Sequence, residues 1–132
     1  MTSIASIETI QQGPALDRDI LDGLFDLVDD DDDSFVRDLF ESFVGSFGDA
    51  RDGMRSALAT GDTEAMRLHA HSLKGSSGNL GALALSDIAK ELQRMGDEGD
   101  ISSAGPWVDA AEEEYNRVMV AVGELLPGFE FA

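Results

Sequence analysis

The apolar residues of this chain recur at helical spacing over most of its length. No segment shows the strict alternation of apolar and polar residues that is typical of a half-buried strand. The predicted helices span residues 16–28, 32–59, 62–80, 82–97 and 103–126. The pattern therefore predicts an all-α protein. We expect an up-down-up-down antiparallel four-helix bundle with a short additional N-terminal helix that lies across it.

The domain organisation follows from where this periodicity begins. Residues 1–15 lack a clear period and end at Gly13-Pro14, so we expect a flexible or loosely docked N-terminal arm. The chain has 132 residues and 42% apolar content, which suits a single core. Residues 16–132 are therefore predicted to form one domain, and without a linker to another module the protein is expected to stand alone.

The charge balance narrows the range of partners. The chain has nine basic and 27 acidic residues, which gives a net charge of −18. Such a charge disfavours binding to nucleic acid or anionic lipid. No apolar run has the roughly 18 residues of a membrane span, and the N-terminus lacks the pattern of a signal peptide. Cysteine is absent, which excludes disulfides and thiolate metal sites. These features predict a soluble cytoplasmic protein.

Five consecutive aspartates, Asp29 to Asp33, precede the longest predicted helix. Their structural interpretation is an N-cap and first turn, where negative charge meets the positive end of the helix dipole. Asp29, Asp31 and Asp33 also have the spacing of the first ligands in an EF-hand loop. Ser34 and Phe40, however, occupy the places where that loop needs glycine and glutamate. We expect no calcium site, no other metal and no cofactor.

The predicted helix 62–80 carries a histidine within a stripe of cations and glycines. At about 100° per residue, Leu73 lies about 200° from His71, so His71 is expected to face solvent when Leu73 faces the core. The residues that share the face of His71 are Arg67, Lys74, Gly75 and Gly78, at angles of about 40°, 60°, 40° and 20° from it. The histidine is thus framed by two of the nine basic residues of the protein and by two glycines.

This stripe suits a site for an anionic group. Two cations can hold a dianion on the imidazole, and Lys74 is one helical turn from it. Each glycine in a helix interior costs about 1 kcal/mol relative to alanine, so Gly75 and Gly78 indicate that a partner must approach the ring closely. The alternative is an ordinary solvated histidine. His69 fits that simpler interpretation, because it lies toward the edge of the core and points about 200° from His71, too far for both to chelate one metal ion.

Residues 70–82, with the sequence AHSLKGSSGNLGA, resemble the signature of the histidine-containing phosphotransfer (HPt) family. That signature is His-x-Leu-Lys-Gly-x-Ser followed, after three residues, by Gly-Ala, and every fixed place is filled from His71 to Ala82. The resemblance continues more weakly through residues 90–96. The lengths of the predicted helices between residues 16 and 126 are also similar to those of the family.

The resemblance implies a phosphorelay intermediate of a two-component system. His71 would accept a phosphoryl group from a receiver aspartate or a (hybrid) histidine kinase and pass it to a response-regulator receiver. Lys74 would steady the phosphoryl oxygens, and Gly75 would open the approach. Because Arg67 and Gly78 share the face of His71, we expect them to belong with Gly75 to the docking surface. The receiver would bring its own acidic residues and magnesium. The chain has no nucleotide-binding motif, so we expect a monomeric phosphoryl carrier and no kinase activity.

Helix arithmetic adds candidates from the following helix. If helices 62–80 and 82–97 form a hairpin, Gln93 lies as far after the turn as His71 lies before it. Gln93 could then accept a hydrogen bond from Nδ1 of His71 and leave Nε2 free as the nucleophile, or it could be a polar surface residue. Lys90 and Arg94 either add positive potential near the histidine or pair with neighbouring carboxylates.

Two other functions compete with phosphotransfer. A helical adaptor of the same fold would bind a signalling partner without phosphorylation, but it would not need the set His71, Lys74 and Gly75. A metal-storing bundle would need Glu-x-x-His spacing, which the sequence lacks. Incubation with a phosphorylated receiver domain discriminates among the three.

Overall fold

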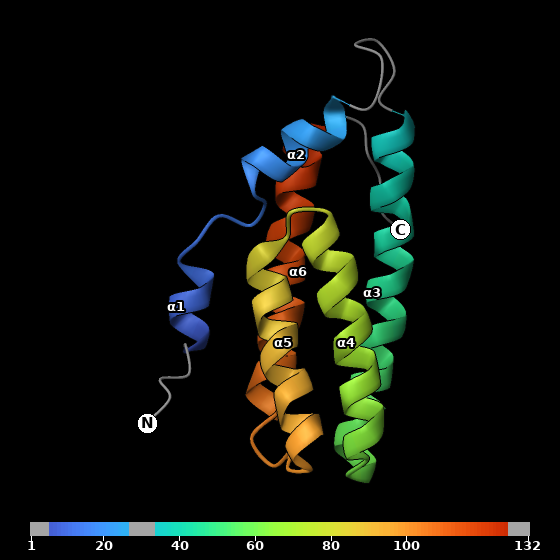
Figure 1. Ribbon diagram of the computed structural model, residues 1–132, viewed down its shortest axis with the longest axis vertical. Helices are drawn as coiled ribbons and strands as arrows, with labels where there is room; N and C mark the ends of the chain where they lie inside the picture. The colour runs from blue at the N-terminus through green and yellow to red at the C-terminus, as the bar shows by residue number, and fades with distance from the viewer. Residues whose placement is uncertain (1–5, 27–33, 127–132) are drawn as a thin grey trace.

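The structure is a computed structural model that describes residues 6–26 and 34–126, and these residues form six helices and no strand (Figure 1). The helices are α1 (Ile7–Gln11), α2 (Arg18–Phe25), α3 (Ser34–Thr60), α4 (Thr63–Asn79), α5 (Leu83–Glu98) and α6 (Gly105–Leu125). The prediction of an all-α fold is confirmed. The five-aspartate run lies outside the described residues. No described helix is both long and apolar enough to cross a membrane.

Helices α3 to α6 form the predicted antiparallel bundle, and each runs opposite to the one before it (Figure 1). Their apolar stripes meet in one core, whose largest fully buried side chains include Phe40, Phe47, Met54, Met66, Leu73, Leu85, Ile88 and Leu92. Phe47 also stacks on Tyr115 of α6, with 3.9 Å between ring centroids. Burial of aromatic and aliphatic side chains at this density is the main stabilising contribution to such a bundle.

Local signals set the ends of the site-bearing helices. The side chain of Asp62 accepts a hydrogen bond from the backbone N–H of Ala65, at 2.9 Å, and so caps the start of α4. Gly81, in the turn to α5, has a φ of 83°, a left-handed conformation that favours glycine. The short turn makes α4 and α5 an antiparallel hairpin, as the sequence predicted.

Helix α2 is the predicted short helix across one end of the bundle (Figure 1). Its N-cap residue, Asp17, donates its backbone N–H to the carbonyl of Gly81 at 2.7 Å. A Cβ on Gly81 would lie 3.2 Å from the carbonyl oxygen of Asp17. Leu21 buries its side chain in the core. The start of α2 therefore packs against the turn between α4 and α5 and stabilises it.

The segment predicted as an arm contains helix α1, which the hydrophobic pattern did not predict. Ile7 and Ile10 pack against the core. Arg117 of α6 donates hydrogen bonds to the carbonyls of Gln11 and Gly13, at 2.9 and 2.8 Å. Its guanidinium also pairs with the fully buried Glu114 at 2.7 Å. The position of this segment is therefore fixed by contacts with α6. Such contacts leave no hydrophobic periodicity in the sequence of the segment itself.

Candidate functional site

His71 is exposed in the middle of α4, and the residues around it alternate between core and solvent as predicted. The inward face of α4 consists of Met66, Ala70, Leu73 and Ser77, all buried. The opposite orientation of Leu73 leaves the His71 imidazole free to meet a partner. The predicted exposure of His71 is confirmed.

His69, the other histidine, lies in the interface between α3 and α4. A Cβ added to Gly53 of α3 would come within 2.3 Å of Nε2 of His69, so the ring rests directly on that glycine. His69 is half-buried, which agrees with the expectation that it lies at the edge of the core. The sequence did not reveal the role of Gly53, because the close contact joins two helices. Of the two rings, only that of His71 is fully open.

Gly75 lies one turn after His71 and faces open solvent. A Cβ at this position would meet no atom within 4 Å outside the adjoining helix backbone. Positive φ values occur among the described glycines only at Gly61, Gly81 and Gly99, so the backbone of α4 does not need glycine at position 75. Neither packing nor backbone conformation explains this glycine, although its helix propensity is poor.

Gly78 has a packing role that the sequence did not predict. It is half-buried, and a Cβ there would lie 3.3 Å from Oγ of Ser86 on α5. Ser86 donates a hydrogen bond from Oγ to the carbonyl of Lys74, at 3.0 Å. Gly96 makes a still closer approach, because its Cβ would lie 2.7 Å from the backbone nitrogen of Arg67. Both glycines therefore let α4 and α5 pack tightly.

The two cations beside His71, Arg67 and Lys74, differ in whether they form ion pairs with carboxylates. Arg67 pairs with Glu64 one turn before it and lies 3.7 Å from Asp97 of α5. The hydrogen bond from Arg67 lowers the pKa of Glu64, which is exposed. Lys74 is half-buried and forms no ion pair with any described carboxylate. Of the two flanking cations, Lys74 is the one whose charge is not already matched.

Gln93 lies at the expected level of α5, where two roles were open to it: a hydrogen bond to His71 or a polar surface position. The contacts between Arg67 and Gly96 and between Gly78 and Ser86 fix the register of the hairpin, and interpolation between them places Gln93 level with His71. No hydrogen bond joins the two side chains. Instead, Oε1 of Gln93 is buried without a hydrogen-bond partner. A buried oxygen without a hydrogen bond is costly, and Oε1 of Gln93 therefore has unused capacity to accept one.

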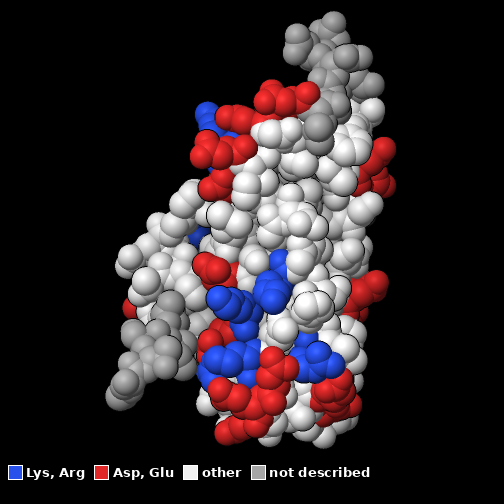
Figure 2. Space-filling view, viewed as in Figure 1, with Lys and Arg blue, Asp and Glu red and all other residues white. Residues whose placement is uncertain are grey.

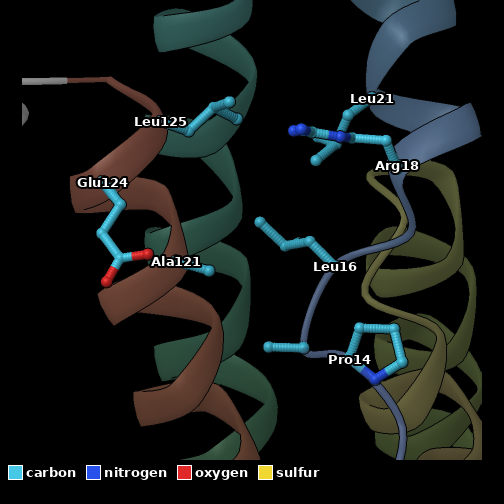
Figure 3. A pocket seen from close by; sticks show the side chains of 8 residues that line it. Pro14, Leu16, Arg18, Leu21, Ala121, Glu124 and Leu125 are labelled. Atoms are coloured by element: carbon cyan, nitrogen blue, oxygen red, sulfur yellow. The ribbon is translucent and has the colours of Figure 1, made fainter.

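Two hollows on the surface lie away from His71. A cleft of about 390 Å³ separates residues 14–21 from the end of α6, and Leu16 and Leu125 extend into it from opposite sides (Figure 3). A polar hollow of about 410 Å³ lies over α3 and α6, where Arg51, Glu112 and Tyr115 line it. No three described His, Asp or Glu side chains come together in a way that could hold a metal ion.

Comparison with known proteins agrees with this geometry. A family model described as the Hpt domain matches residues 38–121. Among solved structures, the chain is similar to the crystal structure of histidine-containing phosphotransfer protein B (HptB) from Pseudomonas aeruginosa PAO1. The TM-score is 0.78 at 28% sequence identity, over 86% of this chain and 95% of the other. No curated protein sequence matches the chain.

Proposed function

Because the chain belongs to the Hpt domain family, we propose that it is a phosphorelay intermediate that carries a phosphoryl group on His71. The assignment to this residue rests on its exposure within the signature. Next to it are Lys74, which has no ion pair among the described carboxylates, and Gly75, which leaves the approach open. His69 offers a weaker candidate, since its ring packs on Gly53.

The proposed reaction is a direct transfer from a receiver aspartyl phosphate. Nε2 of the neutral His71 imidazole attacks phosphorus, the bond between phosphorus and the aspartyl oxygen breaks, and the carboxylate leaves as an N–P bond forms. The ring keeps its proton on Nδ1 during the attack and can lose it afterwards. Passing the group to a second receiver reverses these steps. The carrier therefore needs an accessible nucleophile and no nucleotide site.

Lys74 and Gly75 have separate roles in this proposal. The ammonium group of Lys74 steadies the negative phosphoryl oxygens, because an uncompensated cation interacts strongly with a dianion. Gly75 lets the partner bring its aspartate up to the ring without meeting a Cβ. Arg67 and Gly78 border the docking surface, but each also has a structural contact within the hairpin.

Gln93 is proposed to orient the imidazole. A hydrogen bond from Nδ1–H of His71 to the unsatisfied Oε1 of Gln93 would satisfy this buried oxygen and leave Nε2 as the nucleophile. The level position of the two residues in the hairpin supports this role.

The proposed partners are response-regulator receiver domains and a (hybrid) histidine kinase. We expect the carrier to act as a monomer, because a net charge of −18 on 132 residues makes two copies repel each other.

The test is a screen in which each candidate receiver, phosphorylated on its aspartate, is mixed with the full chain. Transfer of the label to the chain from at least one receiver is expected. Specific binding to receivers with no transfer at all would instead support the adaptor function.

A further inference from the structure

The protein has only two lysines, Lys74 and Lys90, and both lie on the α4–α5 hairpin. Lys90 is exposed and, like Lys74, forms no ion pair with a described carboxylate. The two arginines of the hairpin differ, since Arg67 pairs with Glu64 and Arg94 pairs with Glu91 and Glu98. Figure 2 shows a group of Lys and Arg side chains over α4 and α5, with acidic side chains around the lower ones. The unmatched positive charge of the hairpin therefore comes from its lysines.

The register of the hairpin places these lysines opposite each other. Ser86 faces α4, because its Oγ donates to the carbonyl of Lys74. Lys90 follows Ser86 by four residues, so it lies on the same face of α5 one turn further along. Interpolation between the contacts of Ser86 and of Gly96 puts Lys90 level with Lys74. The two lysines therefore lie on either side of the contact between α4 and α5, close to the level of His71.

We infer that Lys90 is a second cation of the docking site, which with Lys74 attracts the anionic active site of a phosphorylated receiver domain to His71. This inference rests on the proposed function. A protein of net charge −18 repels an acidic partner at long range, and a local pair of unmatched lysines offsets that repulsion where the two reacting groups must meet. Lys90 sits on the neighbouring helix and acts on the approach of the partner, whereas Lys74, one turn from His71, acts on the phosphoryl group itself.

The experiment measures single-turnover transfer from a phosphorylated receiver to the full chain over a range of receiver concentrations and salt. Lys90→Gln should raise the half-saturating receiver concentration about three- to tenfold at low salt and leave the maximal rate unchanged. The difference should vanish near 1 M salt, where the screening length falls to about 3 Å. Lys90→Arg should restore the wild-type value.

Arg18→Gln is the matched control. Arg18 is exposed on α2 and forms no ion pair with a described carboxylate, so the same charge is lost away from the α4–α5 hairpin. Its half-saturating concentration should stay close to that of the wild type. An equal effect of both variants, no effect of Lys90→Gln, or a fall in maximal rate alone would each overturn the inference. If the two variants have equal effects, or Lys90→Gln has none, but the wild type is still labelled, the phosphorelay function stands and only the role of Lys90 is refuted. If the wild type is not labelled at all, both the phosphorelay function and the role of Lys90 are refuted.

Discussion

Replacement of Gly75 by glutamine distinguishes between two roles for this glycine, one in partner docking and one in the stability of the fold. The added Cβ meets no atom within 4 Å outside the adjoining backbone, so the bundle should accept the new side chain. Glutamine is a better helix former than glycine, and the gain of about 0.5 kcal/mol should raise the melting temperature by about 2 °C. Phosphoryl transfer should nevertheless fall about tenfold or more, because the side chain stands between His71 and the partner's aspartate.

Gly96→Ala provides the structural contrast on the partner helix. A methyl group there would lie 2.7 Å from the backbone nitrogen of Arg67 and 2.9 Å from its Cα, so α4 and α5 must move apart. Overpacking costs about 1–3 kcal/mol, and a clash with backbone atoms, which cannot swing aside, belongs at the upper end of that range. The cost therefore outweighs the gain of about 1 kcal/mol from helix propensity. This variant should therefore melt at a lower temperature than the wild type.

The assay pairs thermal melting with receiver-to-His71 transfer on the same preparations. Gly75→Ala, which adds only a methyl group, should be stable and impair transfer less than Gly75→Gln. A Gly75→Gln protein that is stable and transfers at the wild-type rate would refute the docking role. One that melts well below the wild type would show that Gly75 is structural.

Three further changes test other parts of the account. Lys74→Ala should slow transfer or shorten the lifetime of the phosphohistidine with little change in melting, since surface cations contribute about 0–1 kcal/mol to stability; an unchanged rate and lifetime would remove Lys74 from the mechanism. Burial raises the pKa of Glu114, so the folded state binds protons more readily than the unfolded state, and stability should fall as pH rises from about 4.3 toward neutrality. Glu114→Gln keeps an acceptor for Arg117 and should flatten this dependence in pH-resolved denaturation, whereas an unaltered slope would contradict the assignment. Gly53→Ala should shift the ring proton resonances of His69 and leave those of His71 in place, because the new methyl group would overlap the His69 ring; unmoved His69 resonances would contradict that packing.

The long helices were predictable because each buries a continuous apolar stripe. Helix α3 was predicted over residues 32–59 and spans Ser34–Thr60, and α6 was predicted over residues 103–126 and spans Gly105–Leu125. Helix α1 was missed, since five residues carry too little periodicity. Its position depends on Arg117, more than a hundred residues away in the sequence.

The candidate site was predictable as far as one helix determines it. The angles on α4 place His71 outside and Leu73 inside, and both are found there. Contacts between helices could not be derived in the same way. The packing of Gly78 and Gly96 in the α4–α5 interface depends on interhelical distances that no single-helix pattern encodes. Helix arithmetic was enough to place Gln93 level with His71, whereas the partner of its amide depends on side-chain orientations that the sequence does not determine.

The central claim is that His71 alone carries the phosphoryl group. The most direct measurement is labelling of the wild type and of His71→Gln and His69→Gln variants by a phosphorylated receiver. We expect an acid-labile, base-stable label on the wild type, none on His71→Gln, and most of it on His69→Gln. A label that survives in His71→Gln and disappears in His69→Gln would show that His69, and not His71, is the phosphoacceptor.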